Sequence, residues 1–313
     1  MRLIPFAMLA IALLSGCGQG GITGSKQQVE AGSLVDARRG FPTKLVNSPS
    51  AKTPAPQPPP KVFSLVRYDS PVGKLTAYVT PDPKDGKKHP AIIWITGGDS
   101  NTIDELWNEG PAKNDQTASA YRKAGIVTMF PSLRGGNDNP GQRESFFGEV
   151  DDILAAREFL AKQEYVDPAR IYLGGHSTGG TLVLLVAECS EHQFRAVFSF
   201  GPVEDVEGYG PEYLHFDTSN RRELELRSPI RWLNSIKTPV FVFEGVRDGN
   251  LDSLQKLQAA STNPKLHFFP VRGADHFSVL SPLNRMIATR ILNDTGATTN
   301  LAFTEADVLK AGK

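Results

Sequence analysis

The stretch 171–189 constrains the fold of this chain more than any other. It opens with Ile171-Tyr172-Leu173, a short apolar run that is typical of a buried strand. A glycine-rich turn with Ser177 at its centre follows, and the mostly apolar run 181–189 is long enough for a buried helix. Because side chains at Gly175 or Gly179 would crowd so tight a crossing, the pattern predicts a sharp strand-to-helix turn with Ser177 in a strained backbone.

Ser177 is the central residue of a G-x-S-x-G pattern. Placed between a predicted strand and a predicted helix, this pattern resembles the nucleophile elbow of the α/β hydrolases, where the serine is exposed above the sheet. Glycine makes up 29 of the 313 residues, so a chance glycine-rich turn with a solvent-facing serine is the simpler alternative. The residues downstream of the turn favour the elbow.

Strand-like and helical patterns alternate along residues 62–294, the predicted catalytic domain. Two runs, 62–68 and 74–79, flank a turn and predict an antiparallel hairpin. Further strands are predicted at 91–95, 126–130, 196–200, 239–243 and 266–269, with helices at 146–162 and 277–292. The expected class is therefore α/β: an α/β-hydrolase fold with a mostly parallel central sheet, helices on both faces and an N-terminal hairpin.

A serine hydroxyl needs a base within hydrogen-bond reach, and the base needs an orienting carboxylate. In α/β hydrolases the three follow the order serine, acid, histidine. His276 lies between the last predicted strand and the last predicted helix, where this fold requires the base. His192 follows the elbow helix too closely, His267 belongs to a strand pattern, and His215 lies in an insertion.

The acid is expected in the loop after the predicted strand 239–243. We assign it to Asp248, because Glu244 still lies at the end of that strand. Glu244 and Asp252 remain alternatives, although Asp252 is suited to capping a helix at 253–260.

An oxyanion hole needs two backbone N–H donors. One is expected from Thr178, after the nucleophile, and the other from Gly97, Gly98 or Asp99, in the loop after the strand 91–95. Thr96 stands where many lipases and esterases have the histidine of an H-G-G motif, so the identity of the second donor stays open.

The N-terminus predicts export and lipidation. Residues 1–16 contain a short apolar run that suits a signal-peptide core, and Leu14-Ser15-Gly16-Cys17 resembles a bacterial lipobox. That resemblance implies cleavage before Cys17, acylation of its thiol and an extracytoplasmic, bilayer-anchored protein, facing the periplasm or in the outer membrane in a Gram-negative cell. An ordinary secretory leader is the alternative. Residues 17–61 are predicted to be the anchor and a proline-rich tether, of which 34–46 could dock on the domain.

The composition excludes several classes of function. Equal numbers of basic and acidic side chains, 34 of each, give no nucleic-acid footprint. The two cysteines, Cys17 and Cys189, are not expected to form a disulfide, and no Cys/His spacing resembles a zinc site. We expect neither a metal nor another cofactor. The tail 295–313 contains one capping-box pattern before a short helix and no evident chemistry.

Between residues 131 and 202 the chain resembles the catalytic domain of prolyl oligopeptidase-type serine hydrolases. The matching motifs are R-G-G at 134–136, E-V-D-D at 149–152, Y-V-D-P at 165–168 and G-H-S-T-G-G at 175–180, with S-P-I at 228–230 and G-A-D-H at 273–276. The family's triad carries over to Ser177, Asp248 and His276. Two departures are Thr178, where relatives often have tyrosine, and Glu244, where histidine is common.

The resemblance implies a serine hydrolase that cleaves an acyl bond of a small or short-peptide substrate through an acyl-enzyme. Peptidase activity is the expectation from the family. Residues 18–61 leave no room for the β-propeller that oligopeptidases usually carry, which favours a carboxylesterase acting on small or sugar-linked esters. A third possibility is an envelope lipoprotein that only binds. Substrate choice is expected to depend on the insertion 201–226.

Overall fold

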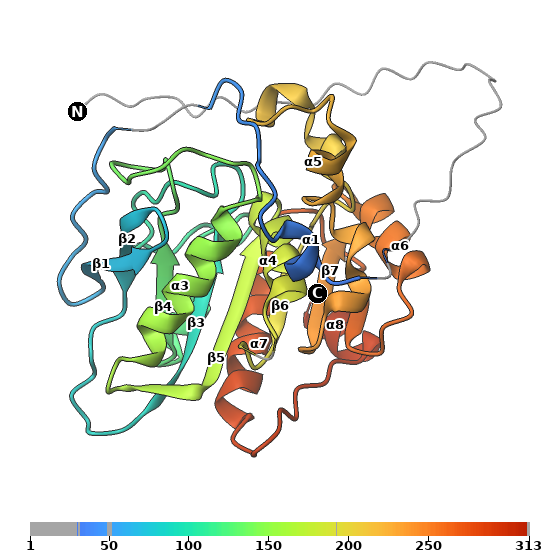
Figure 1. The fold of residues 1–313 in the computed structure, drawn as a ribbon. Helices are drawn as coiled ribbons and strands as arrows, with labels where there is room; N and C mark the ends of the chain where they lie inside the picture. The colour runs from blue at the N-terminus through green and yellow to red at the C-terminus, as the bar shows by residue number, and fades with distance from the viewer. Residues whose placement is uncertain (1–29, 31, 49–51, 192, 312–313) are drawn as a thin grey trace.

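The computed structural model describes residues 30, 32–48, 52–191 and 193–311. In this part of the chain, one sheet contains eight strands in the order β1-β2-β4-β3-β5-β6-β7-β8 (Figure 1). The strands are β1 (Ser64–Ser70), β2 (Gly73–Val79), β3 (His89–Ile95), β4 (Val127–Pro131), β5 (Val166–His176), β6 (Val197–Phe200), β7 (Val240–Gly245) and β8 (Leu266–Val271).

The pairing confirms the predicted α/β-hydrolase fold. β1 and β2 form an antiparallel hairpin, in which Ser70 lies opposite Gly73, and β2 pairs antiparallel with β4. Every other neighbouring pair in the sheet is parallel. The carboxyl ends of β5, β6, β7 and β8 therefore lie side by side at one edge of the sheet, where the loops that carry function in open α/β sheets meet.

Helices cover both faces of the sheet (Figure 1). The helices are α1 (Leu34–Arg38), α2 (Ser119–Lys123), α3 (Glu149–Ala161), α4 (Thr178–Cys189), α5 (Arg221–Glu225), α6 (Leu251–Ala260), α7 (Leu280–Asn293) and α8 (Glu305–Ala311). Four short 3₁₀ helices also occur: η1 (Val206–Tyr209), η2 (Pro211–Tyr213), η3 (Pro229–Arg231) and η4 (Leu233–Ser235).

The core consists of two apolar layers, one on each side of the sheet. Ile93 and Val242 join the layer beneath α3 and α4, whereas their strand neighbours Trp94 and Phe243 join the layer beneath α7. This division follows from the alternation of side chains along a strand. Parallel strands buried on both faces must be apolar at almost every position, which is why these strands stand out in the sequence as continuous apolar runs.

The N-terminal strap, residues 32–48, docks on the domain. Leu34 is fully buried, and the strap pairs with the insertion through a β-bridge between Leu45 and Phe216. Docking of this segment was one of the sequence expectations, and it is confirmed.

The end of the predicted tether also contacts the domain. The Tyr78 hydroxyl donates to the Pro56 carbonyl at 2.6 Å, and Ala55 is buried. In the C-terminal tail, Phe303 packs edge-on against Phe241 with the ring centroids 4.7 Å apart. The predicted capping box is present, since Thr304 Oγ1 accepts from the Asp307 amide before α8.

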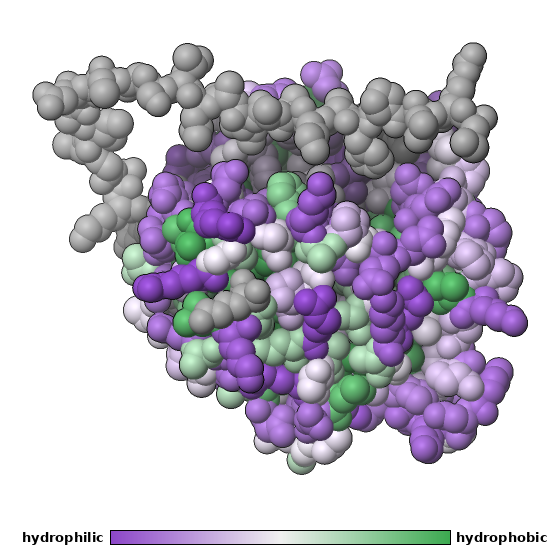
Figure 2. Space-filling model, turned by 180° about the vertical axis from the view of Figure 1, so that it is seen from behind, coloured by the Kyte–Doolittle hydropathy of each residue, from purple (hydrophilic) through white to green (hydrophobic). Residues whose placement is uncertain are grey.

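The predicted leader and Cys17 lie outside the described residues. Within the described part of the chain, no helix has the length and apolar character that a membrane span requires. Seen from behind, the surface is mostly hydrophilic, and its hydrophobic residues form small separate patches (Figure 2).

Candidate active site

Ser177 occupies the turn between β5 and α4. It has φ of 56° and ψ of −116°, an uncommon conformation for a residue with a side chain, and its amide donates to the Phe200 carbonyl at 2.8 Å. A Cβ on Gly175 would lie 2.5 Å from the carbonyl oxygen of Gly179, and one on Gly179 would overlap the Ile95 carbonyl. The glycines are thus required by the close crossing, as the sequence predicts, and the serine is the strained residue between them.

His276 lies in the loop after β8 and faces a buried carboxylate. Its Nδ1 is 3.1 Å from Glu244 Oε1 and 3.2 Å from Oε2. The Glu244 side chain is 0% exposed and that of His276 is 13% exposed. Because a carboxylate accepts hydrogen bonds, this contact fixes the proton on Nδ1 and leaves Nε2 as the basic nitrogen.

The carboxylate beside His276 is therefore Glu244, whereas the sequence assignment was Asp248. The side chain of Asp248 is exposed, and the residue contacts His276 only through its backbone carbonyl, which accepts the His276 amide at 2.9 Å. Asp252 lies in the first turn of α6, which begins at Leu251, and is exposed to solvent. Strand β7 continues to Gly245, so Glu244 belongs to the strand itself.

Two glycines make room for the histidine and its carboxylate. A Cβ on Gly201, where φ is +56°, would lie 2.5 Å from both Glu244 Oε2 and His276 Cε1. A Cβ on Gly249 would overlap Glu244 Oε1. The Asn250 amide donates to Glu244 Oε1 at 3.2 Å, and the Asn250 side chain donates to the Gly201 carbonyl at 2.8 Å. The buried carboxylate is therefore both enclosed and hydrogen-bonded, as its burial requires.

The predicted oxyanion donors fall into two groups. Thr178 is the first residue of α4, and the backbone N–H groups of a helix's first turn have no carbonyl acceptor within the helix, so its amide N–H can donate to a substrate. Its hydroxyl donates to the Gly98 carbonyl at 2.9 Å. Gly98 has φ of +73° and open space where a side chain would stand. The Gly97 amide, in contrast, donates to Gln116 Oε1 at 3.1 Å. Gly97 is thus already engaged, which leaves Thr178 as the first candidate donor and Gly98 or Asp99 as the second.

Two residues that the sequence did not suggest contact this site. His176 is fully buried, and its Nε2 is 2.9 Å from the carbonyl oxygen of His276. Gln116 links His176 to Gly97. No local pattern identifies Gln116, because it lies in a loop far from the elbow along the chain.

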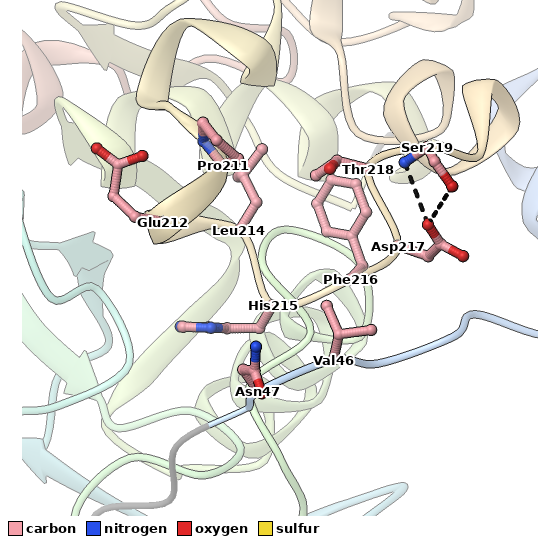
Figure 3. A pocket seen from close by; sticks show the side chains of 10 residues that line it. All are labelled: Val46, Asn47, Pro211, Glu212, Leu214, His215, Phe216, Asp217, Thr218 and Ser219. Atoms are coloured by element: carbon pink, nitrogen blue, oxygen red, sulfur yellow. Dashed lines mark hydrogen bonds between the residues drawn. The ribbon is translucent and has the colours of Figure 1, made fainter.

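The insertion 201–226 and the N-terminal strap enclose a cavity of about 280 Å³ (Figure 3). Val46 and Asn47 of the strap face His215 and Phe216 of the insertion across it. The cavity is lined by Val46, Asn47, Pro211, Glu212, Leu214, His215, Phe216, Asp217, Thr218 and Ser219.

Arg143 connects the surroundings of this cavity to the oxyanion loop. The Ser48 hydroxyl donates to the Arg143 carbonyl at 2.8 Å, and Arg143 Nη2 donates to Asp99 Oδ2 at 2.8 Å. Asp99 directly follows Gly98. The strap thus belongs to the surroundings of the candidate site.

The remaining predicted site residue, Cys17, and the histidine His192 lie outside the described residues. Among the residues that the structure describes, no three His, Cys, Asp or Glu side chains are grouped to hold a metal ion. The buried Arg134 pairs with Asp152 at 3.0 Å and with Glu144, so this arginine is committed to the protein itself.

The sequence profile of the prolyl oligopeptidase family matches residues 113–290, more than half of the chain. Dipeptidyl-peptidase 5 of Porphyromonas gingivalis is 24% identical over 210 residues, which are 60% of this chain and 30% of that protein.

Two solved structures share the fold. A puromycin-hydrolyzing peptidase of Mycobacterium tuberculosis superposes with a TM-score of 0.60 at 21% identity, over 74% of this chain and 39% of its own. An esterase of Pyrococcus furiosus superposes with a TM-score of 0.57 at 18% identity, over 80% of this chain and 97% of its own. This chain thus spans less than two fifths of the two peptidases and matches nearly all of the esterase. The two superpositions show the shared fold. The family match establishes that this chain belongs to the prolyl oligopeptidase family.

Proposed function

We propose that this protein cleaves acyl bonds through a Ser177-Glu244-His276 triad and an acyl-enzyme. Support comes above all from His276, whose Nδ1 faces the buried Glu244 and whose carbonyl is bound by His176, the residue next to Ser177. His276 is thereby held from two sides, by Glu244 and by the residue that precedes Ser177. The strained backbone of Ser177 and the glycines of the elbow fit the same role.

In this mechanism, Ser177 Oγ attacks the acyl carbon while His276 Nε2 takes the hydroxyl proton. Glu244 keeps the other ring proton on Nδ1 and stabilises the imidazolium. The Thr178 amide and one amide of the loop after β3 bind the oxyanion. When the tetrahedral intermediate collapses, the leaving nitrogen or oxygen takes the proton from Nε2. Water then attacks the acyl-enzyme, its proton passes to His276, and the acid product departs as Ser177 regains a proton.

A peptide or aminoacyl amide is the first substrate class, because the matched family is that of prolyl oligopeptidase. A small carboxylic ester is the second, since the chain covers 97% of the Pyrococcus esterase but only 39% of the Mycobacterium peptidase. In both cases, the insertion and the strap are proposed to select the substrate through the cavity that they enclose.

A lipid anchor at Cys17 belongs to the same proposal, and its support is the lipobox-like sequence alone. The mature protein would be held on an extracytoplasmic membrane face by its acyl chains. Metabolic labelling with radioactive palmitate tests this: the wild type should be labelled and partition with membranes, and Cys17→Ala should lose both properties. An unlabelled wild type that is secreted in soluble form would indicate an ordinary leader.

The first experiment is labelling of the full chain with a fluorophosphonate, which reacts with activated serines. Wild type should be labelled, Ser177→Ala should not, and Ser64→Ala, a control on an exposed strand position, should react like wild type. Assays on p-nitrophenyl esters and on Xaa-Pro and aminoacyl amides then separate esterase from peptidase. A folded wild type that is neither labelled nor active would leave a binding lipoprotein as the better reading.

A further inference from the structure

His176 is buried between the elbow and the loop of the catalytic histidine. It is 0% exposed, and both of its ring nitrogens have partners. Nε2 lies 2.9 Å from the His276 carbonyl oxygen, and Nδ1 lies 2.8 Å from Gln116 Nε2. A carbonyl oxygen can only accept, so Nε2 carries the proton and Nδ1 accepts from the Gln116 amide.

Gln116 uses both ends of its amide group. Its Nε2 donates to His176 and also to Asn114 Oδ1 at 2.9 Å, while its Oε1 accepts the Gly97 amide at 3.1 Å. A backbone N–H can only donate, which fixes the orientation of the amide group. One side chain thus connects the oxyanion loop to the histidine that holds His276.

The packing around His176 leaves little freedom for these contacts. A Cβ on Gly97 would lie 2.8 Å from His176 Nδ1 and 3.1 Å from Ser177 Cβ. The rings of His176 and His276 lie 4.5 Å apart between centroids. Burial, together with the neighbouring His276, lowers the pKa of His176 to about 3, so the ring stays neutral.

We propose that Gln116 and His176 form a positioning relay that sets the oxyanion loop and the base His276 together. It rests on the proposed triad. The relay consists of three hydrogen bonds in series: Gly97 to Gln116, Gln116 to His176, and His176 to the His276 carbonyl. The hydrogen bonds of Gln116 and His176 go to the Gly97 amide, the His276 carbonyl, Asn114 and each other, so these residues act by placing other groups.

A neutral histidine suits this role for an electrostatic reason. His276 becomes an imidazolium in each half of the proposed reaction, and a permanent cation at position 176 would oppose that charge at close range. An apolar side chain there would leave the partly buried His276 carbonyl without the His176 donor. A neutral ring with one N–H and one lone pair meets both requirements. Its lone pair on Nδ1 also accepts from Gln116, which joins Gln116 to the same chain of hydrogen bonds.

Gln116→Met is the main test, because Gln116 is only partly buried and its replacement should leave the fold intact. On a p-nitrophenyl ester we expect kcat to fall about 10- to 100-fold, the effect of misplacing a catalytic group by about 1 Å, with KM nearly unchanged. Gln163→Met, which lies just before β5 at the opposite end of that strand from the elbow, is the matched control and should behave like wild type.

Variants at His176 test the second bond of the relay. His176→Leu should lower kcat as strongly as Gln116→Met, whereas His176→Gln should restore much of the activity, because its amide N–H can reach the His276 carbonyl. The double variant Gln116→Met/His176→Leu should be no slower than the slower single variant, since both break one chain of contacts. His267→Gln, on β8 away from the site, is the control.

Three results would overturn the relay: additive losses in the double variant, equal losses in His176→Gln and His176→Leu, or an unchanged kcat in folded Gln116→Met. The rate of fluorophosphonate labelling separates this failure from failure of the proposed function. Normal labelling of Ser177 in wild type with unchanged variants refutes only the relay, whereas a folded wild type without labelling refutes the triad and the relay with it.

Discussion

Removing the charge of Glu244 or of Asp248 without changing side-chain size separates the two possible acids. Glu244→Gln leaves a side chain of the same length in the enclosure formed by Gly201 and Gly249. It removes the acceptor that keeps the proton on His276 Nδ1 and the negative charge that stabilises the imidazolium. Asp248→Asn removes a charge that stands in solvent, and it leaves the backbone contact to His276 in place.

The expected magnitudes differ by several orders. Glu244 is 0% exposed and lies 3.1 and 3.2 Å from Nδ1, so no water can replace it. By analogy with an acid-to-amide change in a serine protease triad, Glu244→Gln should lower kcat by about 10⁴. That factor corresponds to about 5.4 kcal/mol of transition-state stabilisation. Asp248→Asn should change the rate by no more than about twofold, as expected of a surface substitution within about 0.5 kcal/mol.

Steady-state hydrolysis of a p-nitrophenyl ester, with thermal unfolding as the check on folding, measures both effects. Glu244→Asp is a third arm: it keeps the charge but shortens the side chain, so its activity should lie between those of wild type and Glu244→Gln. The reasoning is refuted if Asp248→Asn loses activity by a thousandfold or more while folded Glu244→Gln stays within tenfold of wild type.

Three further changes test the packing and the charges of the domain. Gly201→Ala should lower activity by at least about tenfold in a folded protein, because its Cβ would displace Glu244 and His276; wild-type kinetics would contradict this. Glu188, buried in α4 without a hydrogen-bond partner among the described residues, has its pKa raised by burial well above 4.5. Below pH 4.5 this carboxyl is protonated in both the folded and the unfolded chain, so its burial carries no charge penalty. As pH rises from there toward the folded pKa, the free energy of unfolding should fall by about 1.4 kcal/mol per pH unit, and urea titrations should find no such slope in Glu188→Gln. Burial opposes the charge of Asp294, but hydrogen bonds from Arg195 and Tyr172 hold its pKa at about 2, so its contribution is present above pH 3.8 and lost toward pH 2; acid titration of Asp294→Asn should show a weaker decline over that range.

Local pattern was sufficient for most of the fold. The elbow could be predicted because its glycines, its serine and its flanking apolar runs are contiguous in sequence. The hairpin of β1 and β2 has its turn between two β-prone runs, and the parallel strands are continuously apolar because both faces are buried. His276 could be placed for a similar reason, since it follows the last predicted strand in the order that the fold requires.

The insertion and the strap could be located in the sequence, but the contacts between them could not be predicted from it. Their pairing depends on the Leu45–Phe216 bridge and on Glu223, which accepts from Thr43 and from the Lys44 amide. These contacts join residues more than a hundred positions apart. Neither segment carries a pattern that specifies the other, because these contacts form only between residues that the folded domain brings together.

The carboxylate beside His276 was predicted wrongly from the sequence, although the fold was predicted correctly. The apolar run of β7 ends at Phe243, so the pattern places Glu244 at the end of the strand and predicts Asp248, farther along the loop, as the acid. In the sheet, β8 continues to Val271, and the Glu244–Pro270 and Gly245–Val271 pairs extend β7 by the same two residues. Strand length is thus decided by the neighbouring strand, and that extension buries Glu244 against His276. The open space needed for a buried carboxylate comes from Gly201 and Gly249, which lie on different loops. Sheet topology therefore places Ser177 and His276 at the same edge of the sheet, whereas the choice of carboxylate depends on a two-residue extension of β7 and on the room left by Gly201 and Gly249.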